Sequence, residues 1–251
     1  MASIVLIDGS SYLYRAYHAL PPLTNTTGEP TGALHGVLTM IQKLLREEQP
    51  DNVAIIFDAP GKTFRNELYT EYKSNRPPMP DELRSQIQPI KDAIKAMGLP
   101  LLQIKGVEAD DVIGTLCKQA YQANYNVLVS TGDKDLAQLV NEKVSLVNTM
   151  NNSMMDREGV KKKFDVFPEQ IIDYIALVGD TSDNIPGVPK VGAKTAAKLL
   201  NLYGNIDGIL KNIVEVKGKV GDNLRENIDQ LKLSQNLATI RLDLNLSVSI
   251  E

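Results

Sequence analysis

Short apolar runs alternate with helical patterns through the first two thirds of the 251-residue sequence. The first run, IVLID at 4–8, carries no polar residue before Asp8, which is typical of a strand buried on both faces. Strands that alternate with helices predict an α/β fold, with a mostly parallel central sheet flanked by helices. The expected strands cover 4–8, 53–58, 99–104, 126–131 and 144–149. The expected helices follow residue 8 and cover about 33–48, 81–98, 109–121 and 134–140.

After about residue 165 the pattern changes to helices separated by glycine turns, followed by a Lys- and Asn-rich stretch. This pattern of helices and glycine turns predicts a smaller helical subdomain. We therefore divide the chain into an α/β core over 1–165 and a helical subdomain over 166–251. No internal repeat or low-complexity segment is evident.

The composition, with 43% apolar and 23% charged residues, is ordinary for a soluble globular protein. It therefore restricts the possible functions little. The single cysteine, Cys117, excludes an intramolecular disulfide, fits a reducing compartment, and lies in an amphipathic stretch where a buried, inert thiol is expected. Asp8 interrupts the short apolar start, and no segment approaches the ~20 apolar residues of a membrane span. The sequence therefore favours a cytoplasmic protein without a membrane partner. His18 and His35 lie in helical patterns and are expected to be structural.

Carboxylates follow several of the predicted strands at their carboxyl ends. These ends form one edge of a parallel sheet, where ligands bind, so acids far apart in sequence are expected to be neighbours there. A single Asp at such a place is often only a helix cap or turn residue. Nine acids without a histidine or cysteine among them instead favour oxygen ligation of Mg²⁺ or Mn²⁺, with two ions serving displacement at phosphate. The nine proposed metal ligands are Asp8, Asp58, Glu108, Asp110, Asp111, Asp133, Asp135, Asp180 and Asp183.

The stretch GVEADDVIGT at 106–115 holds three of these acids, with no basic residue within two positions of the cluster on either side. Carboxylates this close repel each other unless a positive charge lies between them, and metal is the expected source of that charge. On one helix, Glu108 and Asp110 would point about 200° apart. They can share an ion only if Glu108 lies in the loop before the helix. Asp111 is then the least secure ligand, as an outer contact or one shared between sites.

A glycine-rich stretch, GVPKVGAKT at 187–195, resembles a phosphate-binding loop but has one residue too many before Lys194, and no strand precedes it. Two helices joined by a glycine turn, over about 183–201, explain it better. The backbone N–H groups and the following helix N-terminus can hold a DNA phosphate, with added charge from Lys190, Lys194 and Lys198. An ordinary helical hairpin without a ligand is the alternative.

The segment 62–80 joins the second strand to the next long helix and mixes cations with aromatic residues. Such a mixture suits single-stranded nucleic acid, because bases stack on rings while cations hold phosphates. A solvated helix face is the alternative. The residues concerned are Lys62, Phe64, Arg65, Tyr69, Tyr72, Lys73 and Arg76.

Together these motifs resemble the 5′ nuclease (flap endonuclease) superfamily, and most of all the N-terminal 5′→3′ exonuclease domain of bacterial DNA polymerase I. The resemblance rests on six stretches in order and runs from about residue 4 to beyond 240. They are IVLIDGSSYLYRAYHA, IIFDAPGKTFR, YKSNRPPMP, GVEADDVIGT, STGDKDLAQLV and GDTSDNIPGVPKVGAKTA. The resemblance implies a helical arch at about 61–97 and a helix–hairpin–helix at about 183–201. It leaves open whether the chain is an excised domain or a stand-alone nuclease.

The resemblance also implies roles for the site residues. Asp8, Asp58, Glu108 and Asp110 would line a first metal site adjoined by Asp111, and Asp133, Asp135, Asp180 and Asp183 would surround a second. Lys73 and Arg76 would be active-site cations at the base of the arch, acting in catalysis with Asp8, Asp58 and Asp110, and Tyr72 would stack on DNA. The hairpin would bind duplex DNA, and in some relatives it also holds K⁺. Its implied contact residues are Gly187, Val188, Lys190, Gly192, Lys194 and Thr195.

The implied activity is Mg²⁺-dependent hydrolysis of DNA at 5′ flaps, nicks and 5′ ends, with Mn²⁺ able to substitute and two or more ions per site. A DNA polymerase, linked or cooperating, is the implied partner of a monomeric nuclease in the bacterial nucleoid. The net charge of −4 does not oppose this, because nine of the 31 acids are proposed ligands and the remaining 22 face 27 Lys and Arg, a net +5. The alternatives are a small-molecule metal-dependent phosphatase and a non-catalytic DNA-junction binder.

Overall fold

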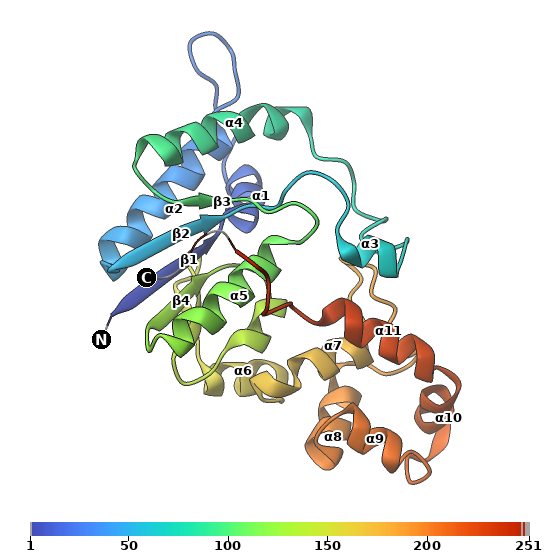
Figure 1. Cartoon of the computed structure of the whole chain (residues 1–251). Coiled ribbons are helices and arrows are strands. Elements are labelled where there is room, and N and C mark those ends of the chain that lie inside the picture. Colours follow the sequence, from blue (N-terminus) through green and yellow to red (C-terminus); the bar gives the residue numbers. More distant parts are fainter. Residues whose placement is uncertain (1, 247, 249–251) are drawn as a thin grey trace.

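The protein, described over residues 2–246 and 248 by a computed structural model, is built on a six-stranded sheet (Figure 1). The strand order is β3-β2-β1-β4-β5-β6, in which all neighbours are parallel except the antiparallel pair β5–β6. The strands are β1 (Ser3–Asp8), β2 (Asn52–Ile56), β3 (Leu101–Leu102), β4 (Asn126–Ser130), β5 (Val144–Asn148) and β6 (Ser153–Met155). The predicted α/β class and mostly parallel sheet are therefore confirmed; β6 was not predicted.

Alternate residues of the central strand β1 build two cores. Val5 and Ile7 pack with α1, α2 and α4, whereas Ile4 and Leu6 pack on the opposite face with α5. A strand whose two faces are both covered must be apolar along its length, which explains the uninterrupted run before Asp8. The helices of this part are α1 (Gly9–Ala19), α2 (Gly32–Glu48), α3 (Phe64–Leu68), α4 (Asp81–Ala96), α5 (Ala109–Gln122), α6 (Arg157–Phe164) and the 3₁₀ helix η1 (Asp135–Leu139).

The segment expected to form a helical arch divides into two parts. Residues 62–80 form only the short α3 and a series of turns that cross toward the carboxyl-terminal helices (Figure 1). Helix α4 instead packs on the sheet side, because Leu83, Ile90 and Ile94 form a buried stripe against α2. The crossing part is thus shorter and less helical than the expected 61–97.

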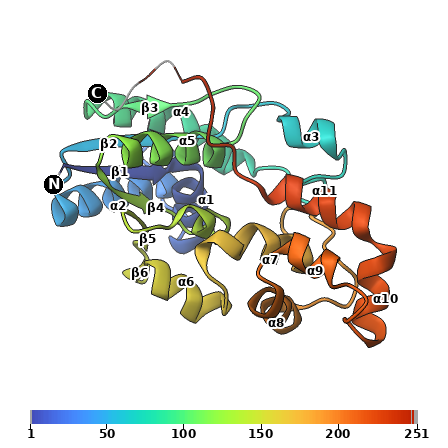
Figure 2. The same cartoon turned by 60° about the horizontal axis from the view of Figure 1, so that its bottom comes forward.

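The carboxyl-terminal helices gather below one end of the sheet, and their core is continuous with the core under α5 (Figure 2). After α11 the chain returns as an extended strap, residues 239–246, that lies along α5. Among the described helices, none has the length and apolar character to cross a membrane. The elements are the 3₁₀ helix η2 (Pro168–Gln170), α7 (Ile171–Val178), α8 (Ala193–Tyr203), α9 (Ile206–Lys211), α10 (Gly218–Glu226) and α11 (Ile228–Ala238).

Candidate active site

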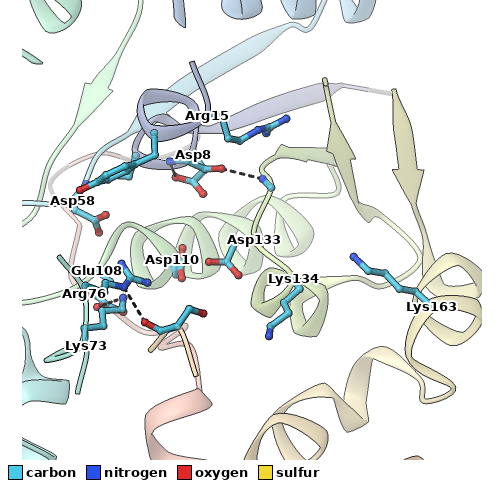
Figure 3. Close-up of a pocket in the computed structure, with 15 residues that line it drawn as sticks. Asp8, Arg15, Asp58, Lys73, Arg76, Glu108, Asp110, Asp133, Lys134 and Lys163 are labelled. Atoms are coloured by element: carbon cyan, nitrogen blue, oxygen red, sulfur yellow. Dashed lines mark hydrogen bonds and ion pairs between the residues drawn. The ribbon is translucent and has the colours of Figure 1, made fainter. Parts of the chain in front are cut away.

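A pocket of about 580 Å³ opens where the carboxyl ends of β1, β2 and β4 meet (Figure 3). The strand order changes direction at β1 and β4, and such a point leaves a crevice at the carboxyl edge of the sheet. Five of the nine predicted acids line it: Asp8, Asp58, Glu108, Asp110 and Asp133. Five cations also line it: Arg15, Lys73, Arg76, Lys134 and Lys163.

Asp8 is both a helix cap and a pocket acid. Its Oδ1 accepts a hydrogen bond from the backbone N–H of Ser11 at 2.8 Å, and its Oδ2 accepts one from Thr131 Oγ1 at 2.8 Å. Burial raises the pKa of Asp8 to about 7, and the charges of Asp58 and Asp133 add to the effect. Asp8 therefore caps α1 and lines the pocket at the same time, so the two interpretations of this residue do not exclude each other.

Asp58 joins two elements at the pocket wall. Its Oδ1 accepts a hydrogen bond from the backbone N–H of Ala109, the first residue of α5, at 2.8 Å. A carboxylate at a helix N-terminus is favoured by the helix dipole and the free N–H groups there. This contact places the end of β2 against the start of α5, and with it the acids of α5 against the sheet edge.

Glu108 lies immediately before α5, with an extended backbone (φ −94°, ψ 161°). This is the position that lets Glu108 and Asp110 face one pocket, so the condition set by the helix geometry is met (Figure 3). Burial raises the pKa of Asp110 well above its usual value, and repulsion from Asp133 and Asp8 acts in the same direction. Asp110 thus lies in a concentrated negative field.

Asp111 does not line the pocket, which corrects its assignment as a metal ligand. Its side chain is fully buried, and both of its carboxylate oxygens are occupied by Arg65, at 2.9 Å and 2.8 Å. The backbone N–H groups of Glu108 and Arg241 donate to the same carboxylate. Part of the missing positive charge of GVEADDVIGT is therefore a protein guanidinium.

Lys73 and Arg76 lie on the turns that cross toward the carboxyl-terminal helices, and both line the pocket. Lys73 has a left-handed backbone (φ 56°), and its N–H donates to the carbonyl of Asp183 at 3.0 Å. Its Nζ contacts Glu108 and Asp183, while the guanidinium of Arg76 is paired with Asp183. Burial opposes the charge of Lys73, but the two carboxylates raise its pKa above the usual value.

Tyr72 does not present its ring to the pocket. The side chain is buried, with 4% exposure, and its hydroxyl donates to Glu108 Oε2 and Asp183 Oδ2, each at 3.1 Å. A ring buried in this way cannot stack on a base, so the expectation for Tyr72 is corrected. It instead links one acid of each predicted metal group.

The remaining acids of the second group lie beside the pocket rather than in its lining. Asp180 is paired with Lys134. Burial alone would raise the pKa of Asp180, but hydrogen bonds from Lys134 and Ser182 outweigh burial and lower it. Burial raises the pKa of Asp135 to about 8, helped by Asp133 and Asp180. The Oδ1 atom of Asp135 is buried with no hydrogen-bond partner in the described part of the chain.

The donor set fits a hard divalent cation, although it is not arranged around one point. Within residues 2–246 and 248, no three His, Cys, Asp or Glu side chains are placed to hold an ion as they stand. Four of the predicted ligands are engaged by the protein's own cations: Glu108, Asp111, Asp180 and Asp183. Several of the others are buried together with raised pKa values, and such a cluster of oxygen ligands is stabilised by divalent cations.

The turn region of the glycine hairpin begins earlier and is longer than the glycine-rich stretch indicates, because residues 179–192 form turns between α7 and α8. Gly187 (φ +63°) is required where its Cβ would lie 2.4 Å from the backbone nitrogen of Gly179. The backbone N–H of Gly187 donates to Ser234 Oγ, and the N–H of buried Val188 donates to the carbonyl of Leu177. Because both N–H groups are bonded within the protein, the expectation that Gly187 and Val188 contact DNA is corrected.

Four of the six predicted hairpin contacts are placed outward or partly outward: Lys190, Gly192, Lys194 and Thr195. Gly192 caps α8, and a Cβ added there would meet nothing within 4 Å. The N-terminus of α8 is therefore open on this side.

Sequence reasoning missed three cations of the pocket. Arg15 lies two turns along α1 from Asp8 and faces the same edge (Figure 3). Lys134 stands between the two predicted ligands Asp133 and Asp135, which was a signal available in the sequence. Lys163, on α6, carried no such signal.

Comparison with known proteins agrees with this geometry. Residues 3–165 match the family model of the 5′-3′ exonuclease N-terminal resolvase-like domain, and residues 166–251 match that of the 5′-3′ exonuclease C-terminal SAM fold. The chain belongs to the 5′-3′ exonuclease family. The family resemblance predicted from the sequence is therefore confirmed.

Members of the 5′-3′ exonuclease family occur among the relatives as separate proteins and within DNA polymerase I. The chain is 54% identical to DNA polymerase I of Pseudomonas aeruginosa, over 100% of this chain but only 28% of the polymerase. It is 46% identical to a 5′-3′ exonuclease of Buchnera aphidicola subsp. Baizongia pistaciae, over 98% of this chain and 83% of the relative.

Two solved structures from T5 share the fold. T5 5′-exonuclease with bound divalent metal ions (zinc) has a TM-score of 0.80 and 26% identity, over 94% of this chain and 89% of that chain. The T5 D15 flap endonuclease in a complex with DNA and metal ions has a TM-score of 0.79 and 25% identity, over 94% and 88%.

Proposed function

We propose that this chain is a Mg²⁺-dependent, structure-specific nuclease that hydrolyses DNA phosphodiester bonds at 5′ flaps, nicks and 5′ ends. The observation that carries the proposal is the pocket itself, where five acids and five cations converge at one sheet edge. The T5 relatives, whose structures hold metal ions and DNA, support this choice of substrate and cofactor class.

The pocket fits a phosphodiester held between opposite walls. Lys73 and Arg76 stand on one side and Arg15 and Lys134 on the other (Figure 3). Bound divalent ions would neutralise the acids and polarise the phosphate for in-line displacement by water. The protein cations would orient the phosphate oxygens and stabilise the charge that develops on them. We expect products that carry a 5′-phosphate and a 3′-hydroxyl.

Lys73 must change partners for this to happen. In the protein alone its Nζ lies 2.6 Å from Glu108 Oε1, within an ion pair that a phosphate oxygen can replace. Once released, Glu108 would be free to act as a ligand alongside Asp8, Asp58 and Asp110. Such an exchange would let Lys73 pair with Glu108 and also hold the substrate.

Duplex DNA is proposed to bind at the hairpin through the exposed N-terminus of α8 and through Lys190, Lys194 and Lys198. Contacts of this kind fix position without reading bases. We further propose Mg²⁺ as the working ion with Mn²⁺ as a substitute, K⁺ at the hairpin, and a DNA polymerase as a linked or cooperating partner. The 28% span of the polymerase relative fits that partner.

One experiment tests the function. A 5′-labelled flap, a double flap and a nicked duplex are incubated with Mg²⁺ or with EDTA, and the products are sized. Cleavage at the junction that requires Mg²⁺ is expected. Intact DNA in Mg²⁺ would favour a junction binder, and turnover of para-nitrophenyl phosphate without DNA cleavage would favour a phosphatase.

A further inference from the structure

Arg65 is the most completely bonded cation near the pocket, yet it does not line it. It lies on α3 and is only 2% exposed. Nε donates to the carbonyl of Leu237 at 2.9 Å, Nη1 to Asp111 at 2.8 Å and Glu108 at 3.2 Å, and Nη2 to Asp111 at 2.9 Å and to the carbonyl of Thr239 at 2.8 Å. A guanidinium has five N–H donors, which matches these five acceptors.

These acceptors come from two separate parts of the fold. Glu108 and Asp111 belong to the start of α5, whereas Leu237 and Thr239 are the end of α11 and the first residue of the strap. Arg65 itself belongs to the crossing segment that also carries Lys73. One buried side chain therefore ties the crossing segment to the acid-bearing helix and to the strap.

The Glu108 carboxylate is the member of this network that faces the pocket. Its Oε2 accepts from Arg65 and from the hydroxyl of Tyr72, and its Oε1 pairs with Lys73. If Lys73 moves to a phosphate, Arg65 and Tyr72 still hold Oε2 and leave Oε1 facing the pocket. A ligand kept in one rotamer by buried donors loses little freedom on binding a cation.

We propose that Arg65 is a positioning residue, which fixes the Glu108 carboxylate at the pocket wall while anchoring the crossing segment to α5 and the strap. This inference rests on the proposed function, because it assumes that Glu108 serves a metal-dependent reaction. It also replaces the expectation that Arg65 is one of the DNA-binding cations of segment 62–80, since a guanidinium with five internal acceptors and 2% exposure does not reach a phosphate.

The strap gains a role from the same contacts. Its Arg241 N–H donates to Asp111 Oδ1 at 2.9 Å, and the Arg241 guanidinium lies 3.4 Å from the centre of the Phe64 ring, next to Arg65. The strap thus closes over the buried pair of Arg65 and Asp111. Removal of either partner would leave a buried charge uncompensated, which is strongly destabilising.

The test uses Arg65→Lys and Arg65→Gln in the full chain, with Arg46→Gln, an exposed arginine in the last turn of α2, as the matched control. For each protein we would measure single-turnover cleavage of a flap at saturating Mg²⁺, flap affinity in EDTA, Mn²⁺ affinity without DNA, and the melting temperature. Arg65→Gln should lower the cleavage rate and the Mn²⁺ affinity by roughly 10- to 100-fold, the usual effect of losing an outer contact to a metal ligand. Flap affinity in EDTA should stay within about twofold.

Arg65→Lys keeps the charge but loses the paired geometry, so its cleavage rate should be intermediate. It also keeps the test open if Arg65→Gln does not fold. Weaker flap binding in EDTA with an unchanged rate would make Arg65 a DNA contact and overturn the proposal. A lower melting temperature with unchanged rate and Mn²⁺ affinity would leave it a purely structural ion pair, which also overturns it. If wild-type protein cleaves no flap, the proposed function fails, whereas the Mn²⁺ titration still decides the role of Arg65.

Discussion

The Nζ atom of Lys73 lies 2.6 Å from Oε1 of Glu108, so a cation expected to meet the substrate is held by an acid expected to meet the metal. Asp183 lies on the other side of Lys73, at 3.5 Å. The charge of Lys73 is therefore already paired with two acids of the protein. A substrate phosphate must displace these acids from Lys73, and a metal ion must displace Lys73 from Glu108. Binding of the two should be mutually favourable, because each frees a partner for the other.

Replacement of Lys73 by alanine should slow the chemical step more than it weakens binding. Loss of one donor aimed at developing charge typically costs about 10²- to 10³-fold in rate. Single-turnover cleavage of a flap, set beside flap affinity in Ca²⁺, separates the two quantities. A loss confined to affinity would show that Lys73 only attracts DNA. Lys118→Ala, at an exposed position of α5, serves as the control.

Replacement of Asp110 by asparagine should abolish cleavage while flap binding in EDTA stays the same or becomes tighter. Asp110 faces the pocket beside Asp133 and Asp8, so a neutral side chain in its place cannot add to the repulsion felt by DNA phosphates. Cleavage at the wild-type rate would show that Asp110 is no metal ligand. Asp207→Asn, an exposed acid on α9, should change neither quantity.

Replacement of Lys194 by glutamine should weaken binding of duplex-containing substrates and reduce the slope of log affinity against log salt by about 1. Lys194 is exposed in the first turn of α8, where it adds charge to an open helix N-terminus. Fluorescence anisotropy over a salt series measures both effects. Equal loss of affinity for single strands and duplexes would place the contact outside a duplex-binding surface.

In EDTA, without divalent ions, the protein should become less stable to unfolding as pH rises from about 5 to 8. Burial is the main cause that raises the pKa of Asp8 to about 7 and of Asp135 to about 8, whereas an unfolded aspartate ionises near about 3.9. The folded state then holds more protons in this window, so its stability is complete below about pH 4 and is lost as pH passes 7 to 8. Melting curves in EDTA measure the loss.

Divalent ions and a single substitution should each reduce this dependence. If Mg²⁺ binds the ionised acids of the folded state, as proposed, it should flatten the curve of melting temperature against pH. Asp135→Asn removes one titrating group and should raise the melting temperature at pH 8 in EDTA, with Asp207→Asn as the exposed control. An unchanged pH slope in Asp135→Asn would contradict the shifted pKa.

Replacement of Gly114 by alanine should destabilise the protein by about 1–2 kcal/mol, although alanine in a helix interior is normally favourable by about 0.5–1 kcal/mol. A Cβ at Gly114 of α5 would lie 2.5 Å from Ile240 and 2.8 Å from Leu242, both in the strap. Urea unfolding gives the sign directly. A stabilised variant would mean that the strap is not packed on α5 in solution.

The sequence predicts the acids at the sheet edge because strand ends are a local signal. The apolar run before Asp8 and the parallel order of neighbouring strands were enough to bring Asp8, Asp58 and Asp133 together. Helical periodicity likewise placed Glu108 before α5, since only that position lets it face the same side as Asp110.

The pairing of charges could not be predicted, because it depends on contacts between distant segments. Arg65 and Asp111 are 46 residues apart, and the backbone carbonyls that complete the Arg65 network lie 172 and 174 residues away. A cation in a basic segment looks the same in sequence whether it meets DNA or a buried carboxylate. Tyr72 was misassigned for the same reason, since burial of its ring depends on Glu108 and Asp183.

The outermost strands of the sheet are its shortest, with two residues in β3 and three in β6. An exposed strand edge can recruit a strand from another molecule, and short edge strands offer too few free N–H and C=O groups for this to continue. Neither edge of the sheet therefore offers a long strand with which another molecule could pair. We expect the protein to resist aggregation through its edges even at high concentration, which suits a parallel sheet whose slow formation leaves edges exposed for longer.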